Sequence, residues 1–327
     1  MLNRFQYTGG HMNIVVAGAA GFLGSHLCDA LILKGHTVIG IDNFLTGQHK
    51  NIERLKQDWN ETQFRFIEAD VCSPVNFLEN IQIHQVYYLA SPASPIDYVK
   101  MPLETLYVGS FGCRNYLELA ERHNARFLLT STSEVYGDPT IHPQPETYWG
   151  NVNPIGPRSV YDESKRYAES LTVAFHNHCN VEVRIARIFN TFGPRMRHDD
   201  GRVIPTFVKQ ALFKEPLTIF GDGSQTRSFC FYSDLIRGLI TLMNNPLSIG
   251  PFNLGNPHEL SMLALATEIN KILDNPAGII HHPLPTNDPT RRRPDLTKTQ
   301  SILGWTPEVS FSKGIRETIA YFRDTLL

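Results

Sequence analysis

The alternation of short apolar runs with helical patterns in the first 190 residues constrains the fold more than any other feature. Residues 13–17 have the pattern of a buried strand, and the helical pattern of residues 22–34 that follows ends at Gly35. Five more strands are expected at 37–42, 64–70, 85–90, 126–131 and 181–188, and long helices at 103–123 and 160–178. Strands and helices that alternate at this spacing form βαβ units, so the sequence predicts a parallel sheet with right-handed crossovers.

After residue 190 the regular alternation of strands and helices ends, because prolines and glycines become frequent and the expected strands become short. A strand is expected at 217–220, and helices at 260–273 and 311–326. We predict an α/β fold in which residues 13–190 form a Rossmann-type, doubly wound parallel sheet. Residues 191–327 mainly form a smaller C-terminal substrate-binding lobe at the sheet's carboxyl edge, and some of their segments return to the first domain. Residues 1–12 are expected to be a flexible leader outside the fold.

Composition and charge exclude several classes of partner. Thirty basic and 32 acidic residues leave a formal charge of −2, so no basic field points to nucleic acid. No apolar run is long enough to span a bilayer, and the first residues lack the apolar core of a signal peptide. The five cysteines are dispersed, and with the thirteen histidines they form no ligand-spaced cluster. We therefore expect a cytoplasmic protein without a bound metal.

A glycine trio lies at the junction of the first strand and the first helix: Gly18-Ala-Ala-Gly21-Phe-Leu-Gly24. Glycines there allow a tight turn, close backbone approach and helix–strand packing, and the exposed helix N-terminus can bind a pyrophosphate. The alternative is a purely structural turn. Asp42 ends the second strand, where an acid can bind the adenosine ribose hydroxyls, although it could instead cap a helix or turn. Because an acid would repel a 2′-phosphate, the pattern favours NAD over NADP.

Two further elements suggest catalysis. Tyr161 and Lys165 are four residues apart on one helical face, and a cation near a phenol lowers its pKa. A Tyr four residues before a Lys is expected about once by chance in such a chain. The polar residues 131–134 at the end of the fifth strand strengthen the assignment, because Thr132 could share a proton with Tyr161 and Glu134 could act as an acid or base. The alternative for that tetrad is a polar exit from the strand.

Together these residues resemble the extended short-chain dehydrogenase/reductase family that acts on nucleotide sugars. The resemblance runs from Asn13 to Arg323 and is most specific to its UDP-glucuronate decarboxylases, also called UDP-xylose synthases. It rests on six further segments: Asp42-Asn-Phe-Leu-Thr-Gly47, Leu89-Ala-Ser-Pro-Ala-Ser-Pro95, Ser131-Thr-Ser-Glu-Val-Tyr-Gly-Asp-Pro139, Asn153-Pro-Ile-Gly-Pro-Arg158, Ala186-Arg-Ile-Phe-Asn-Thr-Phe-Gly-Pro-Arg195 and Arg292-Arg293-Pro294-Asp295.

The resemblance implies a reaction and a set of residues. Tyr161 would remove the C4 hydroxyl proton with help from Thr132, and NAD would take the C4 hydride. The resulting β-keto acid would lose carbon dioxide, and return of the hydride would give UDP-xylose, so NAD is regenerated in each turnover. Lys165 would hold the nicotinamide ribose and lower the pKa of Tyr161. The implied cofactor-binding residues are Gly18, Gly21, Phe22, Leu23, Gly24, Asp42, Asn43, Phe44, Thr46, Gly47, Asp70, Val71, Leu89, Ser91, Tyr161 and Lys165.

Ser133 separates the decarboxylases from related enzymes. The nucleotide-sugar 4,6-dehydratases have an Asp-Glu pair at positions 133 and 134, because expulsion of the C6 hydroxyl needs a proton donor. Serine is a poor acid, and it spares the substrate's carboxylate a like-charged neighbour. The simple 4-epimerases usually lack an acid at position 134. Ser133-Glu134 is therefore similar to the decarboxylases, and both residues are assigned to catalysis with Thr132, Tyr161, Lys165 and Arg292.

The resemblance also implies a substrate side. Arginines suit the two phosphates of a nucleotide sugar because they bind anions in bidentate geometry. Phe220 is implied as the residue that stacks on uracil. The implied substrate-binding residues are Asn115, Arg122, Asn190, Arg202, Phe220, Gln225, Arg227 and Arg292. For the arginines the alternative is a solvated surface charge. Three consecutive arginines at 291–293 could suggest nucleic acid, but a triplet in a chain of near-zero net charge does not support that partner.

One segment departs from the family. Tyr107-Val108-Gly109 stands where the family usually has Lys-Thr-Asn, and that lysine helps to hold glucuronate. Tyr107 carries no positive charge, and Val108 and Gly109 lose polar contacts near the cofactor, whereas Ser164 in place of the common glycine is expected to be harmless. Three alternatives therefore stay open: a nucleotide-sugar 4-epimerase, a decarboxylase of a different nucleotide sugar, and a non-catalytic nucleotide-sugar-binding protein.

Two helices, at 103–123 and 160–178, carry apolar residues on more than one face. Such helices need a second burial partner, and the family resemblance implies a homodimer through a four-helix interface. The residues concerned are Tyr107, Phe111, Tyr116, Tyr167, Leu171 and Phe175.

Overall fold

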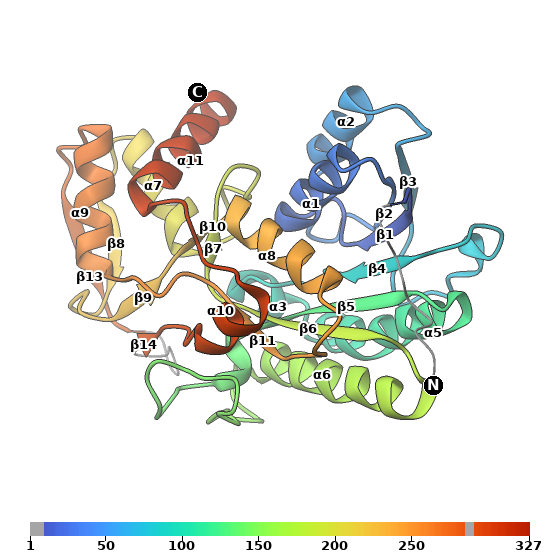
Figure 1. Ribbon diagram of the computed structural model, residues 1–327. Coiled ribbons are helices and arrows are strands. Elements are labelled where there is room, and N and C mark those ends of the chain that lie inside the picture. Colours follow the sequence, from blue (N-terminus) through green and yellow to red (C-terminus); the bar gives the residue numbers. More distant parts are fainter. Residues whose placement is uncertain (1–9, 285–290) are drawn as a thin grey trace.

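A seven-stranded parallel sheet forms the centre of the molecule in the computed structural model, which describes residues 10–284 and 291–327 (Figure 1). Its strand order is β11-β6-β5-β4-β1-β2-β3, and all neighbours are parallel. The strands are β1 (Asn13–Ala17), β2 (Thr37–Asp42), β3 (Phe64–Glu68), β4 (Gln85–Tyr88), β5 (Arg126–Thr132), β6 (Val183–Ile188) and β11 (Phe252–Leu254). The predicted Rossmann-type fold is confirmed.

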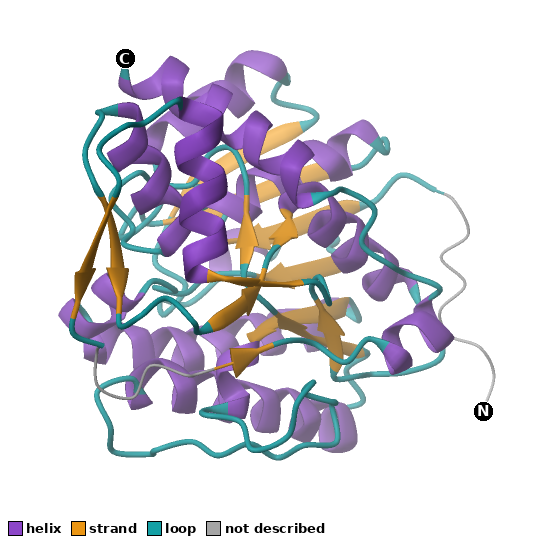
Figure 2. Ribbon diagram, turned by 90° about the vertical axis from the view of Figure 1, so that its left-hand side faces the viewer, coloured by secondary structure: helices purple, strands orange, loops and turns teal. Residues whose placement is uncertain are grey.

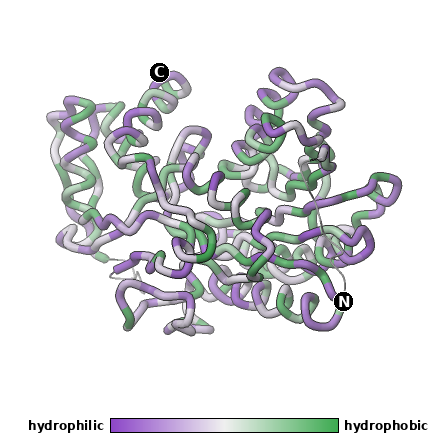
Figure 3. The backbone as a smooth tube through the Cα atoms, in the orientation of Figure 1, coloured by the Kyte–Doolittle hydropathy of each residue, from purple (hydrophilic) through white to green (hydrophobic). Residues whose placement is uncertain are grey.

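Helices cover both faces of this sheet (Figures 1 and 3), which explains why β1, β2, β4 and β5 are buried along almost their whole length. Ile14 and Val16 of β1 belong to one buried cluster, and Val15 and Ala17 to another, because successive side chains of a strand point to opposite faces. One face carries α1 (Phe22–Leu33), α2 (His49–Asp58) and α8 (Tyr232–Asn244). The other carries α5 (Cys113–His123) and α6 (Ser159–Cys179).

The second lobe combines helices with short strands, which form the sheets β10-β7, β12-β9-β14 and β13-β8 (Figure 2). Its helices α7 (Val203–Leu212), α9 (Met262–Leu273) and α11 (Phe311–Leu326) share one apolar core. Its strands are β7 (Thr191–Phe192), β8 (Leu217–Phe220), β9 (Thr226–Ser228), β10 (Cys230–Phe231), β12 (Glu259–Ser261), β13 (Ile279–His282) and β14 (Arg291–Arg292). Three elements of this half instead join the main sheet: β11 pairs with β6, α8 packs on α1, and α10 (Thr297–Leu303) packs on β11.

The helix expected at 103–123 is not a regular α-helix. It consists of α4 (Pro102–Tyr107), a π-helical segment η2 (Val108–Gly112) and α5. The hydroxyl of Tyr88 donates to the Val108 carbonyl oxygen at 2.7 Å, and a Cβ on Gly112 would collide with that same hydroxyl. The backbone thus approaches the sheet closely at the π-helical segment, a tertiary contact that helical periodicity does not reveal.

Other predicted boundaries move by a few residues. The helix expected from residue 260 begins at Met262, because Leu260 pairs with Arg227 in the β12–β9 ladder and Ser261 caps the helix. The strand expected at 64–70 ends at Glu68, and Asp70 instead accepts a hydrogen bond from the Cys72 amide in a turn. The short elements are η1 (Asn76–Leu78), α3 (Pro95–Lys100) and η3 (Ser133–Tyr136).

Residues 1–9 of the expected leader lie outside the described residues. His11 and Met12 contact the start of the sheet, because His11 bonds to Gly35 and Thr37 and the Met12 carbonyl accepts from the Thr37 amide. Within the described ranges, none of the helices has the length and apolar character needed to cross a membrane.

Candidate active site

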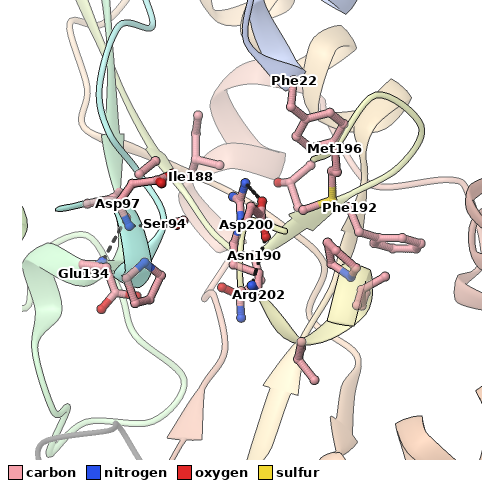
Figure 4. Close-up of a pocket in the computed structure, with 18 of the residues that line it drawn as sticks. Phe22, Ser94, Asp97, Glu134, Ile188, Asn190, Phe192, Met196, Asp200 and Arg202 are labelled. Atoms are coloured by element: carbon pink, nitrogen blue, oxygen red, sulfur yellow. Dashed lines mark hydrogen bonds and ion pairs between the residues drawn. The ribbon is translucent and has the colours of Figure 1, made fainter. Parts of the chain in front are cut away.

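A cavity of about 530 Å³ lies between the carboxyl edge of the sheet and the second lobe. Strand ends, the glycine turn and α6 line one side of it, and the segment 188–207 with β8 and β9 lines the other. Figure 4 shows Ser94, Asp97 and Glu134 grouped apart from Asn190, Asp200 and Arg202. Ligands of open α/β sheets bind at this edge, so the cavity is the candidate active site.

The glycine turn forms a cradle at one end of this cavity. Gly18 has φ +89°, and a Cβ there would lie 2.8 Å from the Ala90 amide nitrogen. A Cβ on Gly24 would collide with the Gly18 carbonyl oxygen. The turn therefore requires glycine and leads directly into the N-terminus of α1, so its backbone fits the pyrophosphate of a dinucleotide.

Asp42 supports that turn as well as facing the adjoining groove. Its Oδ2 accepts from the Ala20 amide at 3.0 Å and its Oδ1 from the Phe44 amide at 2.8 Å. Burial raises the pKa of Asp42, and these amides partly counteract the effect. Asn43 donates to Asp70 at 3.3 Å, so the strand ends expected to bind the adenosine half lie together.

The predicted cofactor-binding residues fall into two groups. The first group lines the cavity and consists of the three glycines of the turn, Phe22, Leu23, Thr46, Leu89, Ser91, Tyr161 and Lys165. The others gather beside it at the ends of β2 and β3 and are Asp42, Asn43, Phe44, Gly47, Asp70 and Val71.

Tyr161 lies beside Thr132, as predicted for a base that acts on a substrate hydroxyl. Burial raises the pKa of Tyr161 to about 12, although a hydrogen bond with Thr132 lowers it. Thr132 ends β5, and its hydroxyl also accepts from the Glu134 amide at 3.2 Å, which caps η3. The ring of Tyr98 stacks on that of Tyr161, with centroids 5.1 Å apart and planes 7° from parallel. This stacking holds the phenol in one orientation.

Lys165 lies near Tyr161, but in the chain alone the pKa of Tyr161 stays above its ordinary value. Its ammonium donates to the Thr130 carbonyl oxygen at 2.9 Å and lies 5.9 Å from the centroid of the Tyr161 ring. Burial lowers the pKa of Lys165 to about 8. The expected electrostatic effect is outweighed by the desolvation of both groups.

Glu134 is held between two arginines. Arg158 Nη2 lies 2.6 Å from its Oε2, and Arg292 Nη1 lies 2.8 Å from its Oε1. Burial alone would raise the pKa of Glu134, but Arg292 and Arg158 outweigh burial and hold the pKa at about 2. Arg292 Nη1 also donates to the Ser133 hydroxyl at 3.0 Å. Glu134 is therefore a carboxylate at neutral pH and cannot donate a proton in this state.

The substrate-side residues are brought together only in part. Arg292 is almost fully buried and lines the cavity with Asn190, Arg202, Phe220, Gln225 and Arg227. Arg202 Nε donates to Asp200 at 2.8 Å, so its charge is already paired. Asn115 and Arg122 lie elsewhere: Asn115 donates to the carbonyl oxygens of Val71 and Ser73, and Arg122 is exposed in the last turn of α5. The prediction that these two residues reach the substrate finds no support in this geometry.

Comparison with known proteins shows the family. Residues 14–255 match the sequence model of the NAD dependent epimerase/dehydratase family. The chain belongs to this family. It is 52% identical to UDP-glucuronic acid decarboxylase 2 of Arabidopsis thaliana over 331 residues, 98% of this chain and 73% of that protein. It is 49% identical to UDP-glucuronic acid decarboxylase 1 of Danio rerio over 310 residues, 94% and 72% of the two chains.

Among solved structures, the chain is similar to UDP-glucuronic acid 4-epimerase from Bacillus cereus in complex with UDP-glucuronic acid and NAD. The TM-score is 0.84 at 30% identity, and the match covers 96% of this chain and 100% of that chain. The resemblance drawn from the sequence motifs is thus confirmed, as are the family and its Rossmann fold.

In this member of the epimerase/dehydratase family, the departing segment 107–109 lies on the outer side of the cavity wall. Tyr107 is 46% exposed, packs on Phe111 with ring centroids 5.6 Å apart, and does not line the cavity. A Cβ on Gly109 would lie 2.7 Å from the Cβ of Ser164. The absence of a side chain at Gly109 therefore leaves room for the side chain of Ser164. This packing between two helices cannot be predicted from either position alone.

The sequence motifs did not identify three side chains of this site. Arg158 was quoted only as part of a motif, although it binds Glu134. Tyr98 stacks on the proposed base, and its buried hydroxyl bonds to no group of the described residues. Asp162 is buried, and its pKa is raised to about 7, first by burial and then by Glu134. Two of them had positions that could have indicated a role: Arg158 ends a motif of the resemblance, and Asp162 directly follows Tyr161. Among the described residues no group of histidine, cysteine and acidic side chains could hold a metal ion.

Proposed function

We propose that this protein converts UDP-glucuronate to UDP-xylose and carbon dioxide, as a carboxy-lyase that retains NAD through each turnover. The observation that carries the proposal is the cavity itself, where the Tyr161–Thr132 pair faces a Ser133-Glu134 pair bound by two arginines. Relatives about 50% identical over nearly the whole chain are named UDP-glucuronic acid decarboxylases, which favours this reaction over a 4-epimerase.

The protein's own residues fit NAD. The glycine turn at Gly18–Gly24 leaves room for a pyrophosphate. The Asp42 carboxylate would repel a 2′-phosphate, so NAD is preferred to NADP. When bound, NAD supplies a hydride acceptor for C4 of the sugar and later returns the hydride. Lys165, at the nicotinamide end of the cavity, is proposed to hold the cofactor's ribose.

We assign Tyr161 as the base that removes the proton of the C4 hydroxyl. The sugar hydroxyl binds between Tyr161 and Thr132, and the Tyr98 ring keeps the Tyr161 oxygen directed at it. Tyr161 must be a phenolate to accept this proton, yet burial holds its pKa at about 12 in the chain alone. Lys165 and the positively charged nicotinamide of bound NAD would supply the charge that lowers this pKa. Tyr161 then keeps this proton and returns it to the C4 oxygen at the end of the cycle.

Arg158 and Arg292 supply the positive charge that Tyr107 does not. Both line the cavity, and a carboxylate already occupies the position between them in the form of Glu134. We place the sugar carboxylate beside this cluster, next to the uncharged Ser133. Loss of carbon dioxide leaves a carbanion at C5, which is stabilised as the enolate of the C4 ketone.

The proton that C5 then gains does not come from Glu134, because Arg292 and Arg158 keep that residue ionised. We assign the donor as a water molecule that hydrogen-bonds to the Glu134 carboxylate, and the hydroxide that it leaves is neutralised by a proton from the solvent. Reaction in D₂O should therefore place one deuterium at C5 of the product. A product without deuterium at C5 would exclude water as the proton donor.

Product analysis tests the proposal. Purified protein is incubated with UDP-glucuronate, and the nucleotide sugars are identified by mass and NMR, with Tyr161→Phe as the inactive control. UDP-xylose with loss of carbon dioxide supports the proposal. UDP-galacturonate would instead identify a 4-epimerase, and an unchanged substrate would point to a different nucleotide sugar or to binding alone.

We also propose a homodimer through α4, the π-helical segment and α6. Tyr107, Phe111 and Tyr167 are each about half exposed, and Leu103 is 56% exposed on the same helices. Tyr116 cannot take part, because it is fully buried against Tyr88. Light scattering at micromolar concentration should give twice the chain mass, and a monomer would contradict the proposal. We place the protein in the reducing cytosol on the dispersal of its five cysteines.

A further inference from the structure

Arg197 joins its own segment to two others at the edge of the cavity. Its Nη2 lies 3.0 Å from Asp97 Oδ1 on α3, and its Nη1 donates to the Thr46 carbonyl oxygen at 3.4 Å. Its Nε donates to Asp199 Oδ1, on its own segment, at 3.1 Å. Arg197 and Asp97 line the cavity, with side chains only 22% and 12% exposed, so water screens their attraction less than at the surface.

The two distant partners of Arg197 lie on opposite sides of β1. Thr46 follows β2 and Asp97 follows β4, and β1 pairs with β2 on one side and with β4 on the other. The glycine turn leaves the carboxyl end of β1, between them. A side chain that contacts both partners therefore spans the groove in which the turn would bind a dinucleotide.

We propose that Arg197 and Asp97 form a bridge across the dinucleotide groove that retains NAD between the two halves of the reaction. The inference rests on the proposed function, because an enzyme that oxidises and then reduces the same sugar must not release its cofactor in between. The bridge links the second lobe to the loop that holds Thr46 and to helix α3 of the Rossmann domain, and the cofactor can leave only while it is open. Both are positioning residues, since neither needs to touch the sugar.

Release of NADH measures the bridge directly. Protein loaded with NADH is mixed with excess NAD, and the loss of bound-NADH fluorescence gives the dissociation rate without any nucleotide sugar. Asp97→Asn and Arg197→Gln should each release NADH about five to ten times faster, the effect of one mostly buried ion pair. The double variant should be no faster than Arg197→Gln, because Asp97→Asn removes an ion pair that Arg197→Gln has already removed.

Asp199→Asn is the matched control. It removes the partner of Arg197 on its own segment and leaves the bridge in place, so NADH should leave at the parent rate. Thermal unfolding of the cofactor-free variants shows that each is folded. Parent-rate release from Asp97→Asn, or effects of the two single variants that multiply in the double variant, would overturn the bridge. Since no substrate is present, this result is independent of whether UDP-glucuronate is decarboxylated.

Discussion

Replacement of Glu134 by glutamine tests the arginine-bound carboxylate at the centre of the site. Burial pushes the pKa of Glu134 upward, yet Arg292 and Arg158 lower it from 4.5 to about 2. At about 1.4 kcal/mol per pH unit, that fall corresponds to about 3 kcal/mol of folding free energy at neutral pH. The side chain is 17% exposed, so solvent screening removes little of this amount.

The sign of the pH dependence follows from the lowered pKa. The stabilisation by Glu134 is complete above its unfolded pKa near 4.5 and is lost as the pH falls towards 2. Glu134→Gln should therefore lower the free energy of unfolding by about 3 kcal/mol at pH 7, and the difference from the parent should shrink at pH 3. Urea unfolding at the two pH values measures it. Equal differences at both would refute the coupling to the arginines.

Turnover gives a second readout for the same variant. Glu134 holds the water molecule that we assign as the C5 proton donor, so its loss should cost as much rate as the loss of a positioned acid or base, about a hundredfold to ten-thousandfold. Glu134→Gln should slow product formation by that amount, bind NAD like the parent, and accumulate reduced cofactor when UDP-glucuronate is added. Asp58→Asn is the control, because it removes an exposed ion pair with Arg54 far from the cavity. Turnover at the parent rate in Glu134→Gln would contradict the assigned role.

Three further predictions follow from individual contacts. Gly24→Val should weaken NAD binding at least about a hundredfold in equilibrium dialysis, because its Cβ would displace the Gly18 carbonyl that shapes the turn. Asp162→Asn should be more stable than the parent at pH 8 but not at pH 4 in urea unfolding, because burial raises the pKa of Asp162 from 3.8 to about 7 and the resulting loss of folding free energy grows between these two pH values and is complete above pH 7. Phe111→Asp should shift the molecular mass in light scattering from dimer to monomer, since Phe111 is 56% exposed on the proposed interface. An unchanged Kd, stability profile or mass would contradict the respective prediction.

Much of the fold could be predicted because its signals are local. The strands at 13–17, 37–42 and 217–220 match their predicted bounds, since continuous apolar runs between glycines and helices leave few alternatives. The π-helical segment at Val108–Gly112 could not, because it depends on the contact between Tyr88 and a backbone carbonyl distant in sequence. Tertiary contacts of this kind override helical periodicity.

The site shows the same division. Thr132 and Glu134 could be placed because parallel strands end at one edge of the sheet, so polar residues that follow such strands meet there. Arg158 and the Asp97–Arg197 pair could not, because their roles depend on pairing between segments far apart in the chain. Glu134 was expected to act as an acid or a base, and its two arginines exclude the acid because they keep it ionised.

The most direct test of the account is the product formed from UDP-glucuronate by the purified, NAD-loaded protein. We predict UDP-xylose, one carbon dioxide per turnover, no net consumption of NAD, and one solvent deuterium at C5 when the reaction runs in D₂O. Formation of UDP-galacturonate would contradict this account. Recovery of unreacted UDP-glucuronate would also contradict it, provided that Tyr161→Phe and the parent bind NAD equally under the conditions used.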